Sequence, residues 1–216
     1  MVRLPFNISL GLSKKKKAPV LYFLGNSFLP HQLLKFLALM RWVKIVHQNH
    51  ESIIVELYGK RIKLLYNFFF IFVDEWKTWE KYYLPPFSLH GKTVLDVGAG
   101  CGETAFFYIL YGAKKIIAIE RDVKALRCLE ENVKENNWNV EIIPEPFKIE
   151  HLNLPHDFMK MDIEGSEAVL LNLQINKPCI VEVHSHELML KFQEKSFKKI
   201  YSHKKEHYVM LFMPDN

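Results

Sequence analysis

The chain from Thr93 to Thr104 reads Thr-Val-Leu-Asp-Val-Gly-Ala-Gly-Cys-Gly-Glu-Thr, an apolar strand that runs into a glycine-rich turn and then into a helix. Glycines at three alternate positions let the backbone turn sharply and approach a ligand closely, because they carry no Cβ. This pattern is typical of a nucleotide-cofactor site. The residues that we expect to contact the cofactor here are Asp96, Gly98, Ala99, Gly100, Cys101, Gly102 and Glu103.

The residue at position 103 indicates which cofactor fits. A dinucleotide-binding turn would have a third glycine there, but the chain has Glu103, whose charge would repel a pyrophosphate. S-adenosylmethionine carries positive charge on its ammonium and sulfonium groups, and an acidic rim formed by Asp96 and Glu103 would attract them. The sequence therefore predicts an S-adenosylmethionine site.

A second apolar strand, Lys115 to Glu120, ends in a carboxylate 22 residues beyond Gly98. A strand-end acid at this distance is placed to accept hydrogen bonds from the two ribose hydroxyls of the cofactor, and we expect Glu120 and Arg121 in the cofactor site. Glycine turns and strand-end acids also occur by chance in many α/β proteins. The two features together favour the cofactor site.

The composition is that of a globular protein. The 216 residues are 49% hydrophobic and 25% charged, and the net charge of +5 permits an anionic partner without requiring one. The odd number of cysteines (Cys101, Cys128 and Cys179) and their wide spacing predict neither a disulfide framework nor a zinc site, so we expect a cytoplasmic protein. The sequence has no pattern of a signal peptide and no apolar run of membrane-spanning length, so we expect no membrane partner.

Residues 1–86 are predicted to form an extension made of a helix and short strands. Its first 30 residues, which include the run Lys14–Lys17, read as an irregular arm. The stretch Phe68 to Trp79 is apolar but does not indicate its type of structure, and Pro85-Pro86 marks the boundary with the next domain. We expect an amphipathic helix at His31–Trp42 and strands at Val43–His47, Ser52–Leu57 and Arg61–Tyr66.

Residues 87–216 are predicted to form the cofactor domain. Strands alternate with helices there, which indicates a mostly parallel, Rossmann-like class I methyltransferase sheet of seven strands with an antiparallel terminal hairpin. Asp122 is a natural N-cap for the helix that follows the second strand. The connection Pro144–Pro155 reads as irregular. The later strands are expected at Val140–Ile143, Asp157–Asp162, Cys179–His184, Phe197–Ser202 and His207–Met213.

Ligands of an open parallel sheet bind at the carboxyl ends of its strands. Methyl transfer requires in-line geometry and a group that removes the proton of the acceptor, so we expect acids or bases beside the cofactor. Asp162, which also belongs to the predicted cofactor site, has capping of the following turn as its alternative role. Glu164 could instead pair with Glu167 in a solvated first helical turn. The predicted catalytic residues are Asp162, Glu164, Glu182 and His184.

A metal site is the alternative use of the same residues. Oxygen and imidazole ligands at neighbouring strand ends can converge on a divalent ion, and the chain offers Asp162, Glu182, His184 and His186 for this. A pair of histidines is more often structural. We therefore expect no metal.

A family resemblance covers residues 80–185. It is carried by Val94-Leu95-Asp96-Val97-Gly98-Ala99-Gly100, Gly112-Ala113-Lys114-Lys115, Asn132, Met161-Asp162-Ile163-Glu164-Gly165-Ser166-Glu167, and Lys177-Pro178 leading into Val181-Glu182-Val183-His184. These segments resemble the FkbM family of methyltransferases. The resemblance implies methyl transfer from S-adenosylmethionine, usually to a hydroxyl of a sugar or secondary metabolite. Cys101-Gly102 departs from the usual residues of the glycine loop, and the first 80 residues find no match in the family, which leaves the acceptor open.

Three functions remain at this stage. The first is O-methylation of a small molecule or sugar. The second is methylation of tRNA or rRNA, with the N-terminal arm, at Lys14–Lys17, and the turn at Lys204-Lys205 as candidate phosphate contacts. The third is a non-catalytic cofactor-binding protein, against which the acids at four strand ends argue. The sequence does not predict an oligomeric state.

Overall fold

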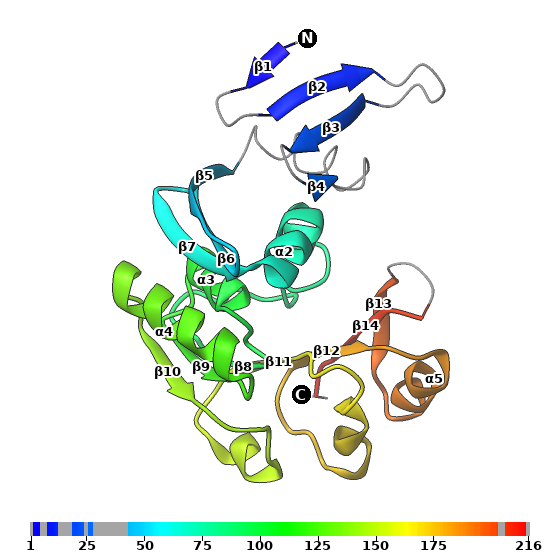
Figure 1. The fold of residues 1–216 in the computed structure, drawn as a ribbon. Coiled ribbons are helices and arrows are strands. Elements are labelled where there is room, and N and C mark those ends of the chain that lie inside the picture. Colours follow the sequence, from blue (N-terminus) through cyan, green and yellow to red (C-terminus); the bar gives the residue numbers. More distant parts are fainter. Residues whose placement is uncertain are drawn as a thin grey trace.

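The computed structural model describes residues 2–4, 8–12, 19–23, 26–27, 43–202 and 206–214. Within these ranges the chain forms three sheets (Figure 1). The predicted helix His31–Trp42, the lysine run Lys14–Lys17 and the turn at Lys204-Lys205 lie outside the described residues.

The largest sheet has seven strands in the order β10-β9-β8-β11-β12-β14-β13. All neighbouring pairs are parallel except those of β14, which is antiparallel to both β12 and β13. This is the predicted mostly parallel sheet with an antiparallel terminal hairpin. The strands are β8 (Thr93–Val97), β9 (Lys115–Ile119), β10 (Val140–Ile143), β11 (Phe158–Met161), β12 (Cys179–Val183), β13 (Lys198–Ser202) and β14 (Tyr208–Phe212).

Successive strand residues point to opposite faces of the sheet, which divides the core in two. Val94 and Ile180 belong to one buried cluster, whereas Leu95 and Val181 belong to the other. The first cluster includes residues of α3 (Glu103–Leu110) and α4 (Val123–Asn136). The second includes residues of α5 (His186–Glu194) and of the 3-10 helix η2 (Glu167–Asn172). The strands are therefore buried on both faces, as expected for a parallel sheet.

The stretch that follows the predicted short strands is a helix. Strands β5 (Lys44–Gln48), β6 (Ser52–Leu57) and β7 (Lys60–Leu65) form an antiparallel sheet, and α2 (Tyr66–Trp79) follows directly. The buried residues of α2 recur at helical spacing, which identifies the face that packs on the protein. The Trp76 ring stacks on Phe106 of α3 with 5.5 Å between centroids, and Trp79 meets Phe107 edge-on at 5.7 Å.

One buried amide connects this part of the chain to the glycine turn. Asn132 of α4 accepts a hydrogen bond from the N–H of Lys63 at 2.7 Å and donates to the Lys63 carbonyl at 2.7 Å. The same side chain donates to the carbonyl of Cys101 at 2.8 Å. Since Asn132 is only 2% exposed, β7 is fixed to α4 and to the turn by hydrogen bonds shielded from water.

The prediction of an irregular arm before residue 30 is wrong for four segments. Strands β1 (Val2–Leu4), β2 (Ile8–Leu12), β3 (Pro19–Phe23) and β4 (Asn26–Ser27) form an antiparallel sheet. Three prolines in the sequence favoured an irregular structure, but Pro19 lies at the first position of its strand, where proline is tolerated. The residues after it, Val20 to Phe23, are β-branched, aromatic and aliphatic, which favours a strand.

Two connections also test the sequence prediction. The predicted N-cap is confirmed, because the Asp122 side chain accepts hydrogen bonds from the N–H groups of Lys124 and Ala125 at 2.9 and 2.8 Å. The connection Pro144–Pro155 is not wholly irregular, since it contains the 3-10 helix η1 (Ile149–Asn153). Short 3-10 turns lack the long periodic pattern that makes a helix predictable.

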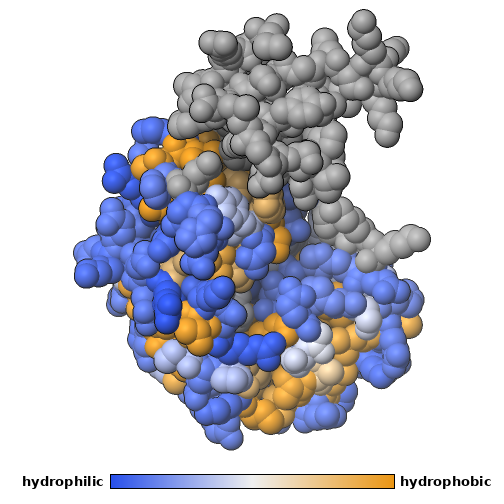
Figure 2. All heavy atoms as spheres, viewed as in Figure 1, coloured by the Kyte–Doolittle hydropathy of each residue, from blue (hydrophilic) through white to orange (hydrophobic). Residues whose placement is uncertain are grey.

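Figure 2 shows a largely hydrophilic face on which hydrophobic residues gather in separate patches. Among the described residues, no helix combines the length and the apolar character that crossing a membrane would require. The three cysteines are buried and none forms a disulfide.

Candidate active site

The glycine turn brings the ends of β8 and β11 together. Gly98 has a φ of 76°, and a Cβ there would lie 1.8 Å from the carbonyl oxygen of Asp162. No side chain fits in that space, so glycine is required both for the turn and for the close approach. The Asp162 N–H donates to the Val97 carbonyl at 3.0 Å and continues the pairing of the two strands. The turn and the end of β11 thus form one continuous edge.

Glu120 lies against this turn. One carboxylate oxygen accepts a hydrogen bond from the Gly100 N–H at 2.8 Å, and the other accepts from the N–H groups of Arg121 and Asp122, each at 2.8 Å. These bonds hold the carboxylate beside the turn, and the oxygen that accepts from Gly100 keeps a lone pair that can accept from a hydroxyl. Glu120 is half-buried, whereas Arg121 is exposed.

The sequence predicted an acidic rim formed by Asp96 and Glu103. This prediction is wrong, because both carboxylates are buried. Asp96 is fully buried beneath the turn, where it accepts a hydrogen bond from the Thr104 hydroxyl at 2.6 Å. Burial raises the pKa of Asp96, against the opposing effect of Lys160. Glu103 is 8% exposed, and its Oε2 has no hydrogen-bond partner among the described residues. Burial raises the pKa of Glu103 to about 8. Ala99 and Cys101 are also fully buried.

Sequence reasoning missed Lys160, the cation under the turn. Its ammonium donates to the Gly98 carbonyl at 2.9 Å and lies 3.4 Å from the Asp96 carboxylate, although the residue is only 1% exposed. Burial acts to lower the pKa of Lys160, but the carboxylates of Asp96 and Asp162 outweigh it and raise the pKa. A lysine inside the apolar strand Phe158-Met159-Lys160-Met161 was the available signal, because an unpaired charge is not tolerated in a central strand.

Three predicted catalytic carboxylates surround His184. The Nε2 atom of His184 lies 3.8 Å from Asp162, 3.9 Å from Glu164 and 4.0 Å from Glu182. Its Nδ1 atom lies 3.7 Å from Glu167, which is fully buried. The structure therefore brings together all four predicted catalytic residues at the ends of β11 and β12.

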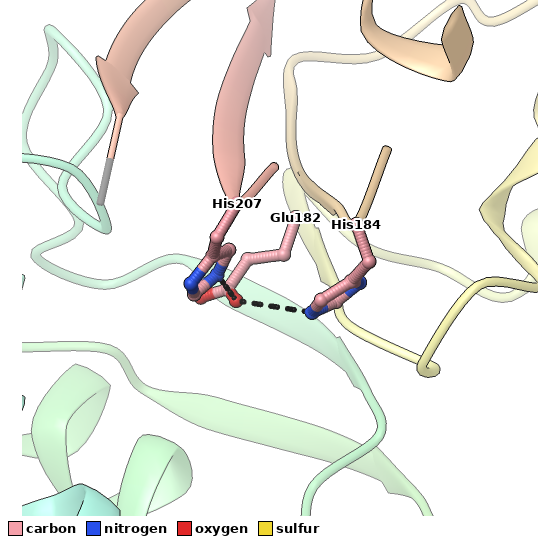
Figure 3. A group of neighbouring side chains, drawn as sticks. All are labelled: Glu182, His184 and His207. Carbon is pink, nitrogen blue, oxygen red and sulfur yellow. Dashed lines mark hydrogen bonds and ion pairs between the residues drawn. The ribbon is translucent and has the colours of Figure 1, made fainter. Parts of the chain in front are cut away.

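Glu182 has two partners that the sequence did not predict. Its carboxylate accepts a hydrogen bond from the Tyr83 hydroxyl, which comes from the segment after α2. It also accepts one from His207 Nε2 at 2.5 Å (Figure 3). The His184 and His207 rings stack with 5.0 Å between centroids. His207 directly precedes β14, which pairs with β12, so only the hairpin register could have revealed this neighbour.

The charges in this group shift one another. Burial and the nearby Glu182 raise the pKa of Asp162 to about 7. Glu167 is the main cause that raises the pKa of His184 to about 9. Burial acts to raise the pKa of Glu182, but the hydrogen bond from His207 outweighs it and lowers the pKa. Shifted groups of this kind at strand ends are typical of catalytic sites.

His186, the other histidine of the predicted metal alternative, points elsewhere. Its ring lies 3.2 Å from the Tyr208 hydroxyl and is exposed. The groups of possible metal ligands are Glu182 with His184 and His207, and Asp162 with Glu164 and His184.

Comparison with known proteins points to methyltransferases. Residues 77–164, less than half of the chain, match the family model "Ribosomal protein L11 methyltransferase (PrmA)". The ribosomal protein L11 methyltransferase of Aquifex aeolicus (strain VF5) is 33% identical over 117 residues, which are 54% of this chain and 40% of that protein. The ribosomal RNA small subunit methyltransferase A of Rhizobium etli (strain CIAT 652) is 35% identical over 89 residues, which are 41% of this chain and 30% of that protein. The chain thus spans less than half the length of both relatives.

Among solved structures, TYW2 of M. jannaschii in complex with AdoMet is similar, with a TM-score of 0.50 and 18% identity. The match covers 78% of this chain and 87% of that chain. At this identity the likeness shows the fold alone. The chain therefore has the fold of class I S-adenosylmethionine-dependent methyltransferases.

Proposed function

We propose that the protein transfers a methyl group from S-adenosylmethionine to RNA. The observation that carries the reaction type is the match of residues 77–164 to a methyltransferase model, because this segment contains the glycine turn and Glu120. For the acceptor, the support is the rRNA methyltransferase among the relatives and the net charge of +5.

The cofactor would lie along the edge formed by the glycine turn. Glu120, already held by the Gly100 N–H, would accept the ribose hydroxyls. Gly98 and Gly100 shape this edge by letting the turn pack directly against Asp162 and Phe68, where a Cβ would clash. Asp96 is too deeply buried to contact the cofactor directly. Its charge would affect the positively charged groups of a bound cofactor only through the Thr104 hydroxyl, which donates to it, and through the turn.

Removal of the acceptor's proton is assigned to the strand-end group. Asp162 and His184 are both partly exposed, at 25% and 28%, and so can be reached by an acceptor. Glu182 is nearly buried and bonded to Tyr83 and His207, which suits a positioning residue. Glu164 is 78% exposed and lies at the outer side of the group.

A ribosomal protein is the second candidate acceptor, favoured by the family model and by the Aquifex relative. O-methylation of a small molecule or sugar, which the FkbM resemblance implies, has no support among the proteins compared above and becomes the third candidate reaction.

The division into an extension, 1–86, and a cofactor domain, 87–216, also remains a proposal. So does the cytoplasmic location, which rests on the unpaired cysteines.

One experiment separates these acceptors. The full chain is incubated with S-adenosylmethionine carrying a labelled methyl group and with ribosomes, purified RNA or a metabolite extract. Label that is sensitive to ribonuclease supports the proposal, whereas label sensitive only to protease identifies a protein acceptor. Label found only in the small-molecule fraction would instead support O-methylation of a sugar or metabolite. A chain that shows no binding heat with S-adenosylmethionine but binds a nicotinamide dinucleotide would refute the reaction type as well.

A further inference from the structure

We infer that His184, together with the carboxylates of Asp162 and Glu164, binds one divalent cation, with Mn²⁺ and Zn²⁺ as the best-suited ions. The sequence predicted no metal, because a pair of histidines is more often structural. In the structure His186 points to Tyr208, whereas His184 lies between the carboxylates of Asp162 and Glu164.

The first support is the spacing of the donor atoms. His184 Nε2 lies 3.8 and 3.9 Å from carboxylate oxygens of Asp162 and Glu164, and the three donor atoms lie within 4.8 Å of one another. These distances are too long for hydrogen bonds. Two ligands that each lie about 2.1 Å from one cation are separated by at most about 4.2 Å, so the observed distances suit a shared ion.

A second, independent support is the group behind His184. Metal-binding histidines usually direct their other ring nitrogen to a carboxylate, which fixes the orientation of the ring. Glu167 is the carboxylate on that side of the His184 ring; it lies 3.7 Å from Nδ1, beyond hydrogen-bond distance, so the ring must shift by a few tenths of an ångström to donate to it. Glu167 is fully buried and accepts hydrogen bonds from the N–H groups of Ile163 and Gly165, each at 3.0 Å, so it is itself held in place.

The third support is an unused acceptor that faces the proposed ion. Asp162 Oδ1 is buried and accepts no hydrogen bond from the described part of the chain, yet it is the oxygen nearest to His184 Nε2. A buried carboxylate oxygen without a donor is costly unless a cation satisfies it. Glu182, by contrast, already accepts hydrogen bonds from Tyr83 and from His207 (Figure 3).

The donor types indicate which ions fit. Carboxylates alone suit Mg²⁺ or Ca²⁺, whereas imidazole suits Zn²⁺ and other transition metals. A mixed set of this kind therefore favours Zn²⁺ or Mn²⁺ over Mg²⁺. The ion would also reduce the negative charge of the two carboxylates Asp162 and Glu164, which would otherwise repel an anionic acceptor. This last step alone rests on the proposed function.

Metal binding is measured by calorimetry on the full chain without an affinity tag, with MnCl₂, ZnCl₂ and MgCl₂ in the absence of cofactor. We expect one equivalent of Mn²⁺ or Zn²⁺ and weaker binding of Mg²⁺. His184→Ala and Glu164→Gln should each weaken Mn²⁺ binding at least tenfold. His186→Ala is the matched control, since it removes an exposed imidazole two residues away and should leave the affinity unchanged.

Equal affinities in the natural protein and in His184→Ala would overturn the inference, as would the absence of bound Mn²⁺ or Zn²⁺. Electron paramagnetic resonance of bound Mn²⁺ adds a readout that loss of folding would not imitate, provided that the variants keep the natural circular dichroism spectrum. Binding of S-adenosylmethionine, titrated separately, keeps failure of the metal site distinct from failure of the proposed reaction.

Discussion

The ammonium of Lys160 donates a hydrogen bond of 2.9 Å to the carbonyl of Gly98, so the middle of one central strand supports the turn at the end of its neighbour. Asp96, 3.4 Å from the same ammonium, supplies the opposite charge. Both side chains are almost completely buried. The turn therefore rests on an ion pair that has little access to water.

Replacing Lys160 by methionine tests this support. The change keeps the length of the side chain but leaves Asp96 without its cation, and breaking a buried pair in this way costs about 3–5 kcal/mol. We expect the free energy of unfolding, measured with urea, to fall by that amount. Lys124→Met, at an exposed position of α4, is the control and should change it little.

The double variant Asp96→Asn/Lys160→Met should recover part of the loss, because it no longer buries an unpaired charge. If the single Lys160→Met variant unfolds at the same urea concentration as the natural protein, the ion pair contributes nothing to the fold.

Glu120→Gln should weaken the binding of S-adenosylmethionine. The amide keeps the shape of the side chain but loses the charged acceptor for the ribose hydroxyls, and a lost hydrogen bond to a charged group costs about 1.5–3 kcal/mol. Calorimetric titration measures the difference. Glu130→Gln, on the exposed side of α4, should bind the cofactor normally; an unchanged affinity in Glu120→Gln would remove Glu120 from the cofactor site.

Two glycines with nearly the same backbone conformation should respond differently to alanine. Gly59 and Gly98 have φ angles of 73° and 76°, but a Cβ at Gly59 meets nothing within 4 Å, whereas one at Gly98 lies 1.8 Å from Asp162. Gly59→Ala should therefore cost only the left-handed strain of about 1–2 kcal/mol. Gly98→Ala should cost clearly more, because the edges of β8 and β11 must separate. Equal losses of unfolding free energy would show that the close approach is not needed.

The stability of the protein should depend on pH through Glu103. Burial raises its pKa in the folded protein from an ordinary value near 4.5 to about 8. Between these values the folded protein holds a proton that the unfolded chain has lost, so the free energy of unfolding falls as pH rises, by at most about 1.4 kcal/mol per pH unit. Above pH 8 the effect should level off.

Glu103→Gln is neutral at every pH and lacks this term. Urea unfolding of both proteins at pH 5, 6, 7 and 8 should show the variant gaining stability relative to the natural protein across the series. A constant difference between the two proteins would show that the Glu103 carboxyl ionises normally in the folded state.

The positions along the chain of the strands of the seven-stranded sheet, and that of the glycine turn, followed from local pattern. Glycines after an apolar strand, and an acid at the end of the next, are short-range features that a sequence shows directly. Helix α2 was harder, because its run of aromatic residues is consistent with a buried strand as well as with a helix. In the structure this stretch is a helix whose buried face packs on Phe106 and Phe107.

The candidate site shows the same division between local and distant information. Asp162, Glu164, Glu182 and His184 end two strands and were predictable from that position alone. Tyr83 and His207 reach Glu182 from segments 99 and 25 residues away, through the packing of the extension and the register of the terminal hairpin. No spacing in the sequence encodes these contacts. The predicted rim failed at Asp96 because this strand-end acid turns inward to the buried Lys160, 3.4 Å away.

The bridge made by Asn132 couples the extension to the cofactor turn energetically. One amide binds both Lys63 in β7 and Cys101 in the turn, so an ordered turn and a docked β7 strand favour each other. By thermodynamic reciprocity, the two effects are equal in free energy. If a bound cofactor stabilises the docking of β7, the docked β7 strand increases the affinity for the cofactor by the same amount. If the cofactor lies at the glycine turn, as proposed, β7 would act as a remote part of its site without touching the ligand.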